Sequence, residues 1–504
     1  MSFKILSFIL KGVPSNYLIL HPTTAEENDL TPGSLVTSSD GKEGFRLLTS
    51  SSVPQGLAGI SPSKLQESDL NEGNSIALIS SGLEGVTQII KKKMRGEKLN
   101  PTEIETFISS LDHGLLTNSH IAAFGAAVEI QGMHGEEITS VARSILNHSK
   151  RFTPKGTKIV DKHSIGGIAG NRITPLMIPI IAAGGLTIPK VSTRAITSPA
   201  GTVDALEVVM PVDLTFEEAS EVLDVTGACM VNGATVGLGS TADKFLSAIS
   251  QVKIDPKEMM IASILAKKKA AGADFVLIDL PTGKGSKLPS KDAARALAYD
   301  FSRVGNNLGQ RVECVISPGD KPIGAMIGPA LEMTEVLQIL ENKAGDLSLK
   351  RKAVTLAGLI FEAVHQADRG HGRKLASELI ESGKALTKFK DIVEAQGGDR
   401  SVHSESMEQA PYSHIITAEQ GDIVYSLDSY NIGSMARAAG APQDASAGVI
   451  LHVDRGDNLK TGDPIVEIRS HSERKISEAE AMMRTAPPVL FEKSVLEHIT
   501  GISE

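Results

Sequence analysis

Cysteine, tryptophan and aromatic residues are scarce in this chain. It has two cysteines, Cys229 and Cys314, no tryptophan and 4% aromatic residues over 504 positions. Two cysteines cannot build the disulfide framework of a small secreted domain, and neither has the sequence spacing of a zinc ligand. We therefore expect a cytoplasmic protein that folds in a reducing compartment.

The chain also lacks a basic excess and a long hydrophobic run. Lys and Arg number 51 against 60 Asp and Glu, which gives a formal net charge of −9. A nucleic-acid-binding surface requires excess positive charge, so we expect no nucleic-acid partner, although a small basic pocket for a phosphorylated metabolite is compatible. The longest apolar run, PLMIPIIAAGGL at 175–186, is too short to span a bilayer and contains Pro179, so we expect no membrane partner.

Hydrophobic periodicity divides the chain into four segments. Residues 1–82 have short apolar runs between turn-forming residues, 83–156 have helical periods, 157–400 alternate strand-like and helix-like runs, and 411–504 are β-rich again. Between the last two segments, the polar stretch 397–411 has the composition of a mobile connector. Alternating strands and helices imply parallel strands joined by crossover helices. The predicted fold is a multidomain α/β protein: an N-terminal β-rich module, a helical domain completed by later helices, a central α/β domain with a mostly parallel sheet, and a C-terminal α+β domain.

Two helix starts are marked by capping residues. Asn100 stands as a candidate N-cap, with Pro101 at the first helical position and Glu103 at the third. Thr215 and Glu218 have the spacing of a capping box. We therefore expect helices to begin directly after Asn100 and Thr215.

A glycine-rich loop, DKHSIGGIAGNR at 161–172, follows a strand-like run and precedes a helix-like run. Glycines such as Gly167 let the backbone approach a ligand closely, and amides at the start of the next helix favour an anion. Lys162 adds a positive charge and Ser164 a hydroxyl donor. His163, between them, is either a hydrogen-bond donor or proton carrier, or a packed neutral side chain. A glycine-rich turn needed only for packing is the competing interpretation of the loop.

Two further loops have the same strand-to-helix setting. STRAITSPAGTVD at 192–204 is rich in hydroxyl groups, and its Arg194 can bind an oxyanion through two parallel hydrogen bonds. LIDLPTGKGSK at 277–287 ends on Lys287, which can reach a second anionic group, although a solvated basic turn is the alternative. Because parallel strands end at one edge of a sheet, we expect these loops to face a common crevice.

The helix-like run KIDPKEMMIASILAKKKAAG at 253–272 carries a fourth set of polar residues. Asp255 precedes the helix at Pro256, and an N-cap is its simplest interpretation. Ser263 and Lys267 are four residues apart and share one helix face. A Ser–Lys pair can serve nucleophilic catalysis, but the strand-elbow setting of such a nucleophile is missing from the sequence.

These segments together resemble the nucleoside phosphorylase-II family, which includes the thymidine and pyrimidine-nucleoside phosphorylases. DKHSIGG matches the K-H-S-x-G-G phosphate loop of that family, and STRAITSPAGTVDALE is similar to its signature S-G-R-x-L-x-x-T-G-G-T-x-D-x-x-E, with substitutions. IASILAKKKAAGAD resembles the helix on the base side, and the match runs in order over residues 84–485. Thr193 replaces the first signature glycine. That change, the PTGKGSK turn and the additional N-terminal module are similar to the AMP phosphorylase branch of the family.

The resemblance to this branch implies a role for each matched position. Asp255 would be the proton donor, and His163 is a second candidate for the catalytic machinery. Lys162, Ser164 and Ser192 would hold inorganic phosphate. The substrate-binding positions would be Gly167, Thr193, Arg194, Ala195, Ile196, Thr197, Ser198, Thr202, Ser263, Lys267 and Lys287.

The resemblance implies phosphorolysis of nucleoside 5′-monophosphates, in which AMP and phosphate give adenine and ribose 1,5-bisphosphate, with CMP and UMP as further candidate substrates. Inorganic phosphate is then a co-substrate, and no cofactor or metal is expected. Because family enzymes are dimers, we expect a homodimer or a larger homo-oligomer. Three alternatives stay open: a thymidine or pyrimidine-nucleoside phosphorylase, a non-catalytic nucleotide sensor, and an enzyme like anthranilate phosphoribosyltransferase. The last normally needs an acidic cluster for magnesium and pyrophosphate, which the sequence does not show.

Overall fold

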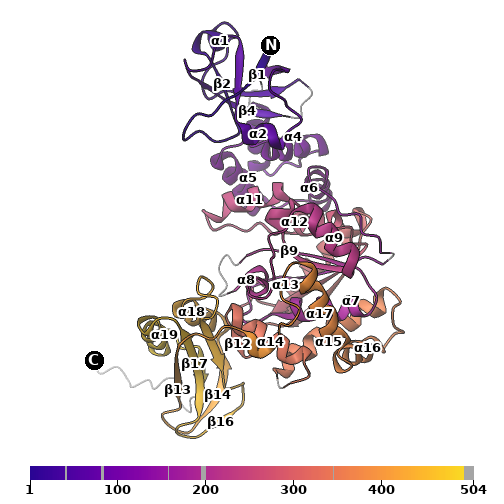
Figure 1. Cartoon of the computed structure of the whole chain (residues 1–504), viewed down its shortest axis with the longest axis vertical. Coiled ribbons are helices and arrows are strands. Elements are labelled where there is room, and N and C mark those ends of the chain that lie inside the picture. Colours follow the sequence, from indigo (N-terminus) through magenta and orange to yellow (C-terminus); the bar gives the residue numbers. More distant parts are fainter. Residues whose placement is uncertain (40–42, 81–83, 157, 195–199, 344, 493–504) are drawn as a thin grey trace, which may run out of the picture. The chain divides into compact units, whose positions relative to one another are not determined.

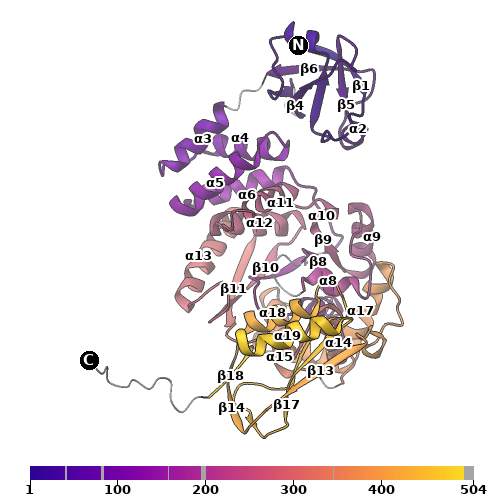
Figure 2. The same cartoon turned by 90° about the vertical axis from the view of Figure 1, so that its left-hand side faces the viewer.

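The chain forms two compact units in the computed structural model (Figures 1 and 2). The first comprises Met1–Ser149 with Gly239–Lys267, and the second comprises Lys150–Leu238 with Lys268–Glu504. The structure describes residues 1–39, 43–80, 84–156, 158–194, 200–343 and 345–492.

The first unit begins with a closed β-barrel whose strands run in the order β1-β5-β2-β4-β3-β6. These strands are β1 Ser2–Ser7, β2 Tyr17–Leu20, β3 Leu35–Ser38, β4 Gly44–Thr49, β5 Leu57–Ile60 and β6 Ser75–Ser80. A strand, a short helix that starts at proline and a second strand occur twice in it, with α1 (Pro22–Glu26) between β2 and β3 and α2 (Pro62–Glu67) between β5 and β6. Phe3, Phe45 and Leu47 lie in its apolar core. The predicted N-terminal β-rich module is confirmed as a barrel.

A helical bundle completes the first unit. Its helices are α3 Glu84–Met94, α4 Pro101–Asp112, α5 Asn118–Gln131, α6 Gly135–Asn147, α11 Ser240–Ser250 and most of α12 Lys257–Ala270. Helix α4 begins with the predicted cap, in which the Asn100 side chain accepts from the amide of Glu103 at 2.9 Å and Glu103 accepts from the amide of Asn100 at 2.8 Å. Phe107 of α4 stacks on Phe124 of α5, with ring centroids 3.9 Å apart, and holds the two helices together.

The second unit is built on parallel strands. The strands are β7 Val160–Ser164, β8 Ile188–Ser192, β9 Ala228–Asn232, β10 Phe275–Thr282 and β11 Arg311–Pro318. Strands β11-β10-β7 form one parallel sheet and β8-β9 another, and an isolated parallel bridge between Ile159 and Thr187 joins them. Figure 2 shows β10 and β11 side by side. The predicted parallel sheet is confirmed, and the carboxyl ends of β7, β10 and β11 share one edge.

Helices join and cover these strands. They are α7 Ile173–Ala183, α8 Thr202–Glu207, α9 Phe216–Thr226, α10 Gly233–Val236, α13 Lys291–Asn307, α14 Pro329–Leu340, α15 Leu347–Ala363, α16 Gly372–Glu381 and α17 Lys384–Ala395. The apolar run of the sequence is helix α7, which is buried almost throughout and packs against α15 and α17, as expected for a helix that is hydrophobic on all sides. Helix α9 begins at the predicted Thr215–Glu218 capping box.

The C-terminal part contains two small sheets and two helices. Strands β12 Met326–Ile327, β15 Gly448–Leu451, β17 Pro464–Ser470 and β13 Tyr412–Thr417 form one sheet, and β16 Asn458–Leu459, β14 Asp422–Leu427 and β18 Val489–Phe491 form the other. Helices α18 (Ser429–Ala439) and α19 (Glu473–Thr485) pack on each other and on β17. The predicted C-terminal α+β domain is confirmed.

The prediction of a mobile connector at 397–411 is wrong in its central part. A 3₁₀ turn at Ser404–Ser406 is fixed by Ser404, which is buried and donates its amide and its hydroxyl to the Glu341 carboxylate at 2.9 and 2.6 Å. Lys343 adds ion pairs to Glu341 and Glu405 at 3.0 Å each. A polar composition alone does not reveal such specific hydrogen bonds.

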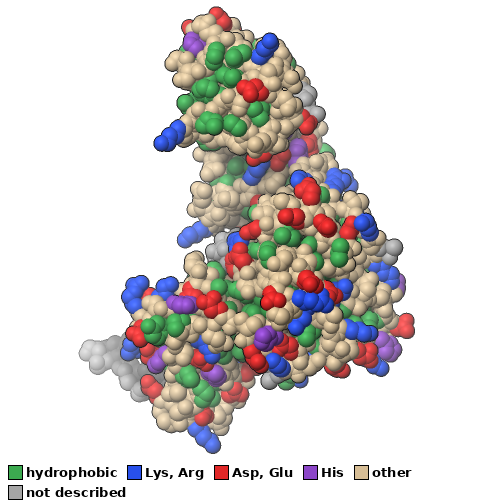
Figure 3. All heavy atoms as spheres, viewed as in Figure 1, with side chains coloured by type: hydrophobic (Ala, Val, Ile, Leu, Met, Phe, Trp, Pro, Cys, Tyr) green, Lys and Arg blue, Asp and Glu red, His purple; other side chains and the backbone are tan. Residues whose placement is uncertain are grey.

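The surface carries charges of both signs. On the face that Figure 3 draws, acidic and basic side chains are interspersed over the described residues. None of the helices in the described part of the chain is long and apolar enough to cross a membrane.

Candidate active site

Lys162 lies two residues before the carboxyl end of β7. It stands on β7, is 2% exposed, and its Nζ lies 3.0 Å from Oγ1 of Thr174 in the first turn of α7. The N-cap residue of α7, Arg172, makes no side-chain capping hydrogen bond. The first-turn amides of α7 can therefore bind an anion beside Lys162, with the helix dipole in the favourable direction.

The strand edge is rich in lysines. Around Lys162 lie the buried Lys190, Lys268, Asp161 and Asp279 and the half-buried Lys352. Lys268 pairs with Asp161 at 2.7 Å and Lys352 with Asp279 at 2.8 Å, while Lys190 donates to the backbone carbonyl of Lys162 at 3.1 Å. Each of the two aspartates is thus paired with one lysine, so this group contains four lysines for two aspartates.

Burial and the excess of lysines over aspartates lower the pKa of two of these lysines. Burial lowers the pKa of Lys162 to about 7, and the nearby Lys352 and Lys268 contribute to the fall while Asp279 opposes it. Burial, reinforced by the charge of Lys268, also holds the pKa of Lys190 well below its usual range. An anion seated at this edge would favour the protonated lysines, so the edge suits an anionic ligand.

Ser164 belongs to a hydrogen-bonded cluster across three strands. Its Oγ donates to Oδ2 of Asp279 at 2.8 Å, and the two residues are register partners on β7 and β10. Ser317 of β11 donates to Oδ1 of Asp279 at 2.6 Å. Lys352 of α15 pairs with Asp279 and donates to Ser317 at 3.1 Å. The Asp279 carboxylate thus fixes the orientation of the Ser164 hydroxyl.

The glycine-rich loop and the third loop meet at Gly167. Gly167 has a φ of 110°, which favours glycine, and a Cβ added to it would lie 3.8 Å from Cγ of Lys287. Both residues are exposed. These two predicted nucleotide-binding positions therefore lie side by side.

The C-terminal part supports the same glycine-rich loop. Ser429, the first residue of α18, accepts a hydrogen bond from the amide of Ala169 at 2.9 Å, and Ala169 belongs to the apolar core of the C-terminal part. The glycine-rich loop, which follows β7, is therefore also held by a residue 260 positions further along the chain. Ser429 has no role in the sequence prediction.

Arg194 is engaged by carboxylates. Its guanidinium binds Glu207 in two-point fashion at 2.5 and 2.8 Å and Asp213 at 2.7 Å, so the pairing predicted with an oxyanion is made with protein carboxylates. The structure places Ser192 at the end of β8 and Thr202 at the start of α8. Thr193 is exposed. The predicted contacts Ala195, Ile196, Thr197 and Ser198 lie outside the described residues.

Arg172 links the first and second loops. It is 8% exposed, its Nε pairs with Glu332 of α14 and its Nη2 donates to the carbonyl of Ala200. Ala200 lies two residues after Ser198, the last residue of the predicted run from Thr193 to Ser198. The buried arginine thus holds the Ala200 carbonyl and α14 together.

The predicted residues of the base side belong to the first unit. Asp255 stands in the turn before α12 and is exposed. Ser263 is buried in α12, and Nζ of Lys267 pairs with Asp243. This ion pair argues against Lys267 as the base of a Ser–Lys nucleophile. The other predicted contacts belong to the second unit, so a site shared by Asp255 and the phosphate loops stays a prediction.

His163 is half-buried on β7 between Lys162 and Ser164. Since successive residues of a strand face opposite sides, His163 points away from the face that Lys162 and Ser164 share. This orientation favours the packed interpretation of His163 over the proton carrier.

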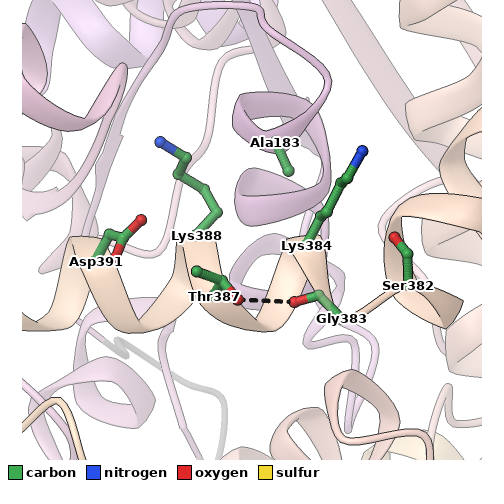
Figure 4. Close-up of a pocket in the computed structure, with 7 residues that line it drawn as sticks. All are labelled: Ala183, Ser382, Gly383, Lys384, Thr387, Lys388 and Asp391. Atoms are coloured by element: carbon green, nitrogen blue, oxygen red, sulfur yellow. Dashed lines mark hydrogen bonds between the residues drawn. The ribbon is translucent and has the colours of Figure 1, made fainter.

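A hollow elsewhere in the second unit carries none of the predicted residues (Figure 4). It lies where α17 begins and is lined by Ala183, Ser382, Gly383, Lys384, Thr387, Lys388 and Asp391. The ammonium group of Lys388 donates a hydrogen bond to the backbone carbonyl of Thr226 at 2.9 Å, which links α17 to the end of α9. Within the described residues there is also no group of three or more His, Cys, Asp or Glu side chains that could hold a metal ion.

Sequence reasoning missed Thr174, Asp279, Ser317 and Lys352. A signal existed for Asp279, because a lone acidic residue inside the apolar strand FVLIDLPT must find a buried partner. Lys352 had no such signal, since it lies on a helix 73 positions beyond Asp279.

Family models match this architecture segment by segment. The glycosyl transferase family, a/b domain, matches residues 156–386, and the glycosyl transferase family, helical bundle domain, matches residues 87–149. The pyrimidine nucleoside phosphorylase C-terminal domain matches residues 423–489. The fold and the cationic strand edge thus define a glycosyl transferase composed of a helical bundle and an α/β domain.

Two relatives that align over nearly the whole chain identify the family within this class of glycosyl transferases. The chain is 39% identical to the AMP phosphorylase of Pyrococcus furiosus over 487 residues, covering 96% of this chain and 97% of that protein. It is 36% identical to the AMP phosphorylase of Methanosarcina barkeri over 504 residues, covering 99% of both chains. The chain belongs to the AMP phosphorylase family.

A solved structure shares the fold of part of the chain. Anthranilate phosphoribosyltransferase from Thermus thermophilus aligns with a TM-score of 0.53 and 18% identity, covering 61% of this chain and 99% of that one. At this identity the likeness concerns the fold alone.

Proposed function

We propose that the protein cleaves AMP by phosphorolysis, giving adenine and ribose 1,5-bisphosphate. The observation that carries the proposal is the buried cationic edge formed by Lys162, the start of α7 and the Ser164–Asp279 pair. Full-length similarity to AMP phosphorylases supports the same reaction. Inorganic phosphate is the co-substrate that this edge receives.

The reaction requires a nucleophile aimed at the sugar. A phosphate oxygen attacks C1′ as the bond from C1′ to N9 of adenine breaks, through an oxocarbenium-like state in which the sugar carries positive charge. Lys162, the α7 amides and Ser164 hold the phosphate so that its attacking oxygen faces the sugar. The bond electrons leave with adenine.

Protonation of adenine completes the step. Asp255 donates a proton to a ring nitrogen of the departing base, which avoids release of an adenine anion. Since Asp255 is exposed in this structure, bound substrate must exclude water from it before the proton is transferred.

A second anion-binding position accounts for the preference for a nucleotide. Lys287 and Gly167 lie side by side next to the phosphate loop, and Lys287 binds the 5′-phosphate. CMP and UMP carry the same group and are further candidate substrates. We also propose a homodimer or larger homo-oligomer, as in the dimers of the wider family.

A pyrimidine-nucleoside phosphorylase is the alternative that one finding favours, namely the match of the C-terminal domain model. A substrate panel decides between the two. The purified protein is incubated with AMP, CMP, UMP, adenosine, uridine or thymidine, with and without phosphate, and released base is measured by chromatography. Phosphate-dependent release from AMP, at least about tenfold faster than from adenosine or thymidine, supports the proposal. Faster release from thymidine or uridine contradicts it.

A further inference from the structure

The hydrogen atom of the Ser164 hydroxyl is committed to the protein. Asp279 is fully buried and its carboxylate pairs with Lys352 at 2.8 Å, so it is ionised and can only accept hydrogen bonds. Ser164 must therefore donate across the 2.8 Å contact to Oδ2 of Asp279. A hydroxyl has one hydrogen, and what Ser164 offers to a ligand is the acceptor capacity of its oxygen.

This arrangement is fixed on every side of the carboxylate. Ser317 donates to the other oxygen of Asp279 at 2.6 Å, and Lys352 donates to Ser317 at 3.1 Å. Oδ2 of Asp279 accepts from both Ser164 and Lys352, so a reversed Ser164 hydroxyl would place two oxygens 2.8 Å apart with no hydrogen between them. The donor direction of Ser164 is thus set by the Asp279 carboxylate of β10, which is paired with Lys352 of α15.

An oxyanion that contacts Ser164 must carry its own proton. Monohydrogen phosphate has one P–OH group, whereas sulfate at neutral pH has none, although the two are tetrahedral dianions of similar size. Two oxygens without a proton in contact would repel each other, because each presents only lone pairs. The nearby Lys162 attracts both anions through charge, so charge does not discriminate between them.

We propose that Ser164, held as a donor by Asp279, accepts a hydrogen bond from the proton-bearing oxygen of monohydrogen phosphate and thereby selects phosphate over sulfate. This inference rests on the proposed function, in which phosphate is the nucleophile. It also orients that nucleophile, because the oxygen at Ser164 is the protonated one and the unprotonated oxygens are left for Lys162, the α7 amides and the sugar.

Anion binding by calorimetry, without nucleotide, tests the inference. For the unmodified protein, sulfate binds at least about tenfold more weakly than phosphate, the loss expected for one hydrogen bond to a charged group. Arsenate, which carries the same proton as phosphate, binds within about threefold of it. Sulfate binding as tightly as phosphate overturns the inference.

Two serine variants test whether the selectivity for phosphate over sulfate depends on Ser164. Ser164→Ala weakens phosphate binding about tenfold and does not weaken sulfate binding, so the selectivity is lost. The matched control Ser317→Ala removes the other serine of the Asp279 cluster and retains the selectivity. An equal loss for both anions in Ser164→Ala shows that Ser164 acts as a donor and overturns the inference.

The two proposals fail separately. Cleavage of AMP by an enzyme that does not distinguish sulfate from phosphate contradicts the inference alone. Selective phosphate binding without phosphorolysis of any nucleotide contradicts the proposed function alone.

Discussion

Phosphate affinity should fall as the pH rises above neutrality, because Lys162 loses its proton in the empty site. Burial lowers the pKa of Lys162 to about 7, so most of the empty protein is deprotonated at this position at about pH 8. A bound dianion favours the protonated ammonium and raises its pKa. Binding therefore takes up a proton, and the affinity decreases with pH wherever the empty site has lost that proton.

The size of the effect follows from the same pKa. Between about pH 8 and pH 9 the protonated fraction of the empty site falls about tenfold, which corresponds to about 1.4 kcal/mol of binding free energy. In this interval inorganic phosphate is almost entirely the dianion, so its own ionisation contributes little. The dissociation constant for phosphate should rise about tenfold across this pH unit.

Calorimetry measures both parts of the prediction. Titration of phosphate into the protein at the two pH values gives the affinities, and repetition in buffers of different ionisation enthalpy gives the proton uptake, which should approach one per site. The Lys162→Met variant, which has no titrating group at this position, should bind more weakly at about pH 8 and show a flat pH dependence. An affinity that is constant over the interval, or an unchanged slope in Lys162→Met, would refute the assignment to Lys162.

Three further substitutions test other parts of the account. Asp255→Asn should lower kcat with AMP by about 10²- to 10⁴-fold while AMP affinity measured by calorimetry stays near normal, since the loss of a general acid slows only the chemical step; near-normal turnover would rule out this acid. Lys287→Ala should lower kcat/KM by about 10- to 100-fold with AMP, the loss expected for a charge-assisted hydrogen bond, and by little with adenosine. The exposed Lys284 of the same turn supplies the matched control Lys284→Ala, and equal losses on both substrates would remove Lys287 from the 5′-phosphate. Arg172→Met leaves the buried Glu332 without its ion-pair partner and should destabilise the protein by about 3–5 kcal/mol in thermal unfolding, whereas the double variant Arg172→Met/Glu332→Met should recover much of that loss. A single variant as stable as the unmodified protein would contradict this role.

The sequence was informative where a local rule determines the structure. The Asn100 and Thr215 caps were predictable because a capping side chain binds an amide only three residues away. The glycine-rich loop was predictable because a strand, a glycine run and a helix follow one another in the chain, and parallel strands bring such loops to one edge. The proximity of Gly167 and Lys287 agrees with this expectation.

The rest of the site depends on contacts between distant residues. Asp279 meets Ser164, Ser317 and Lys352 from three different elements, and no periodicity links them. Arg194 was expected to be available to an oxyanion, but the sequence could not show that Glu207 and Asp213 would reach its guanidinium. Charge pairing of this kind is decided by tertiary packing.

The strand–helix–strand unit that occurs twice in the barrel was also not predicted from the sequence. HPTTAE and SPSKLQE have little identity, yet each places a capping side chain before a proline at the first helical turn. Equivalent capping chemistry, rather than identical residues, preserves the repeated structure.

The most direct test of the central claim follows the oxygen atoms of phosphate. The protein is incubated with AMP and fully ¹⁸O-labelled inorganic phosphate, and the sugar product is analysed by mass spectrometry. Attack of phosphate on C1′ predicts ribose 1,5-bisphosphate with all the oxygens of the 1-phosphate labelled, together with unlabelled adenine. Unlabelled ribose 5-phosphate, or AMP that is bound without being cleaved, would contradict the claim that the cationic strand edge seats a nucleophilic phosphate.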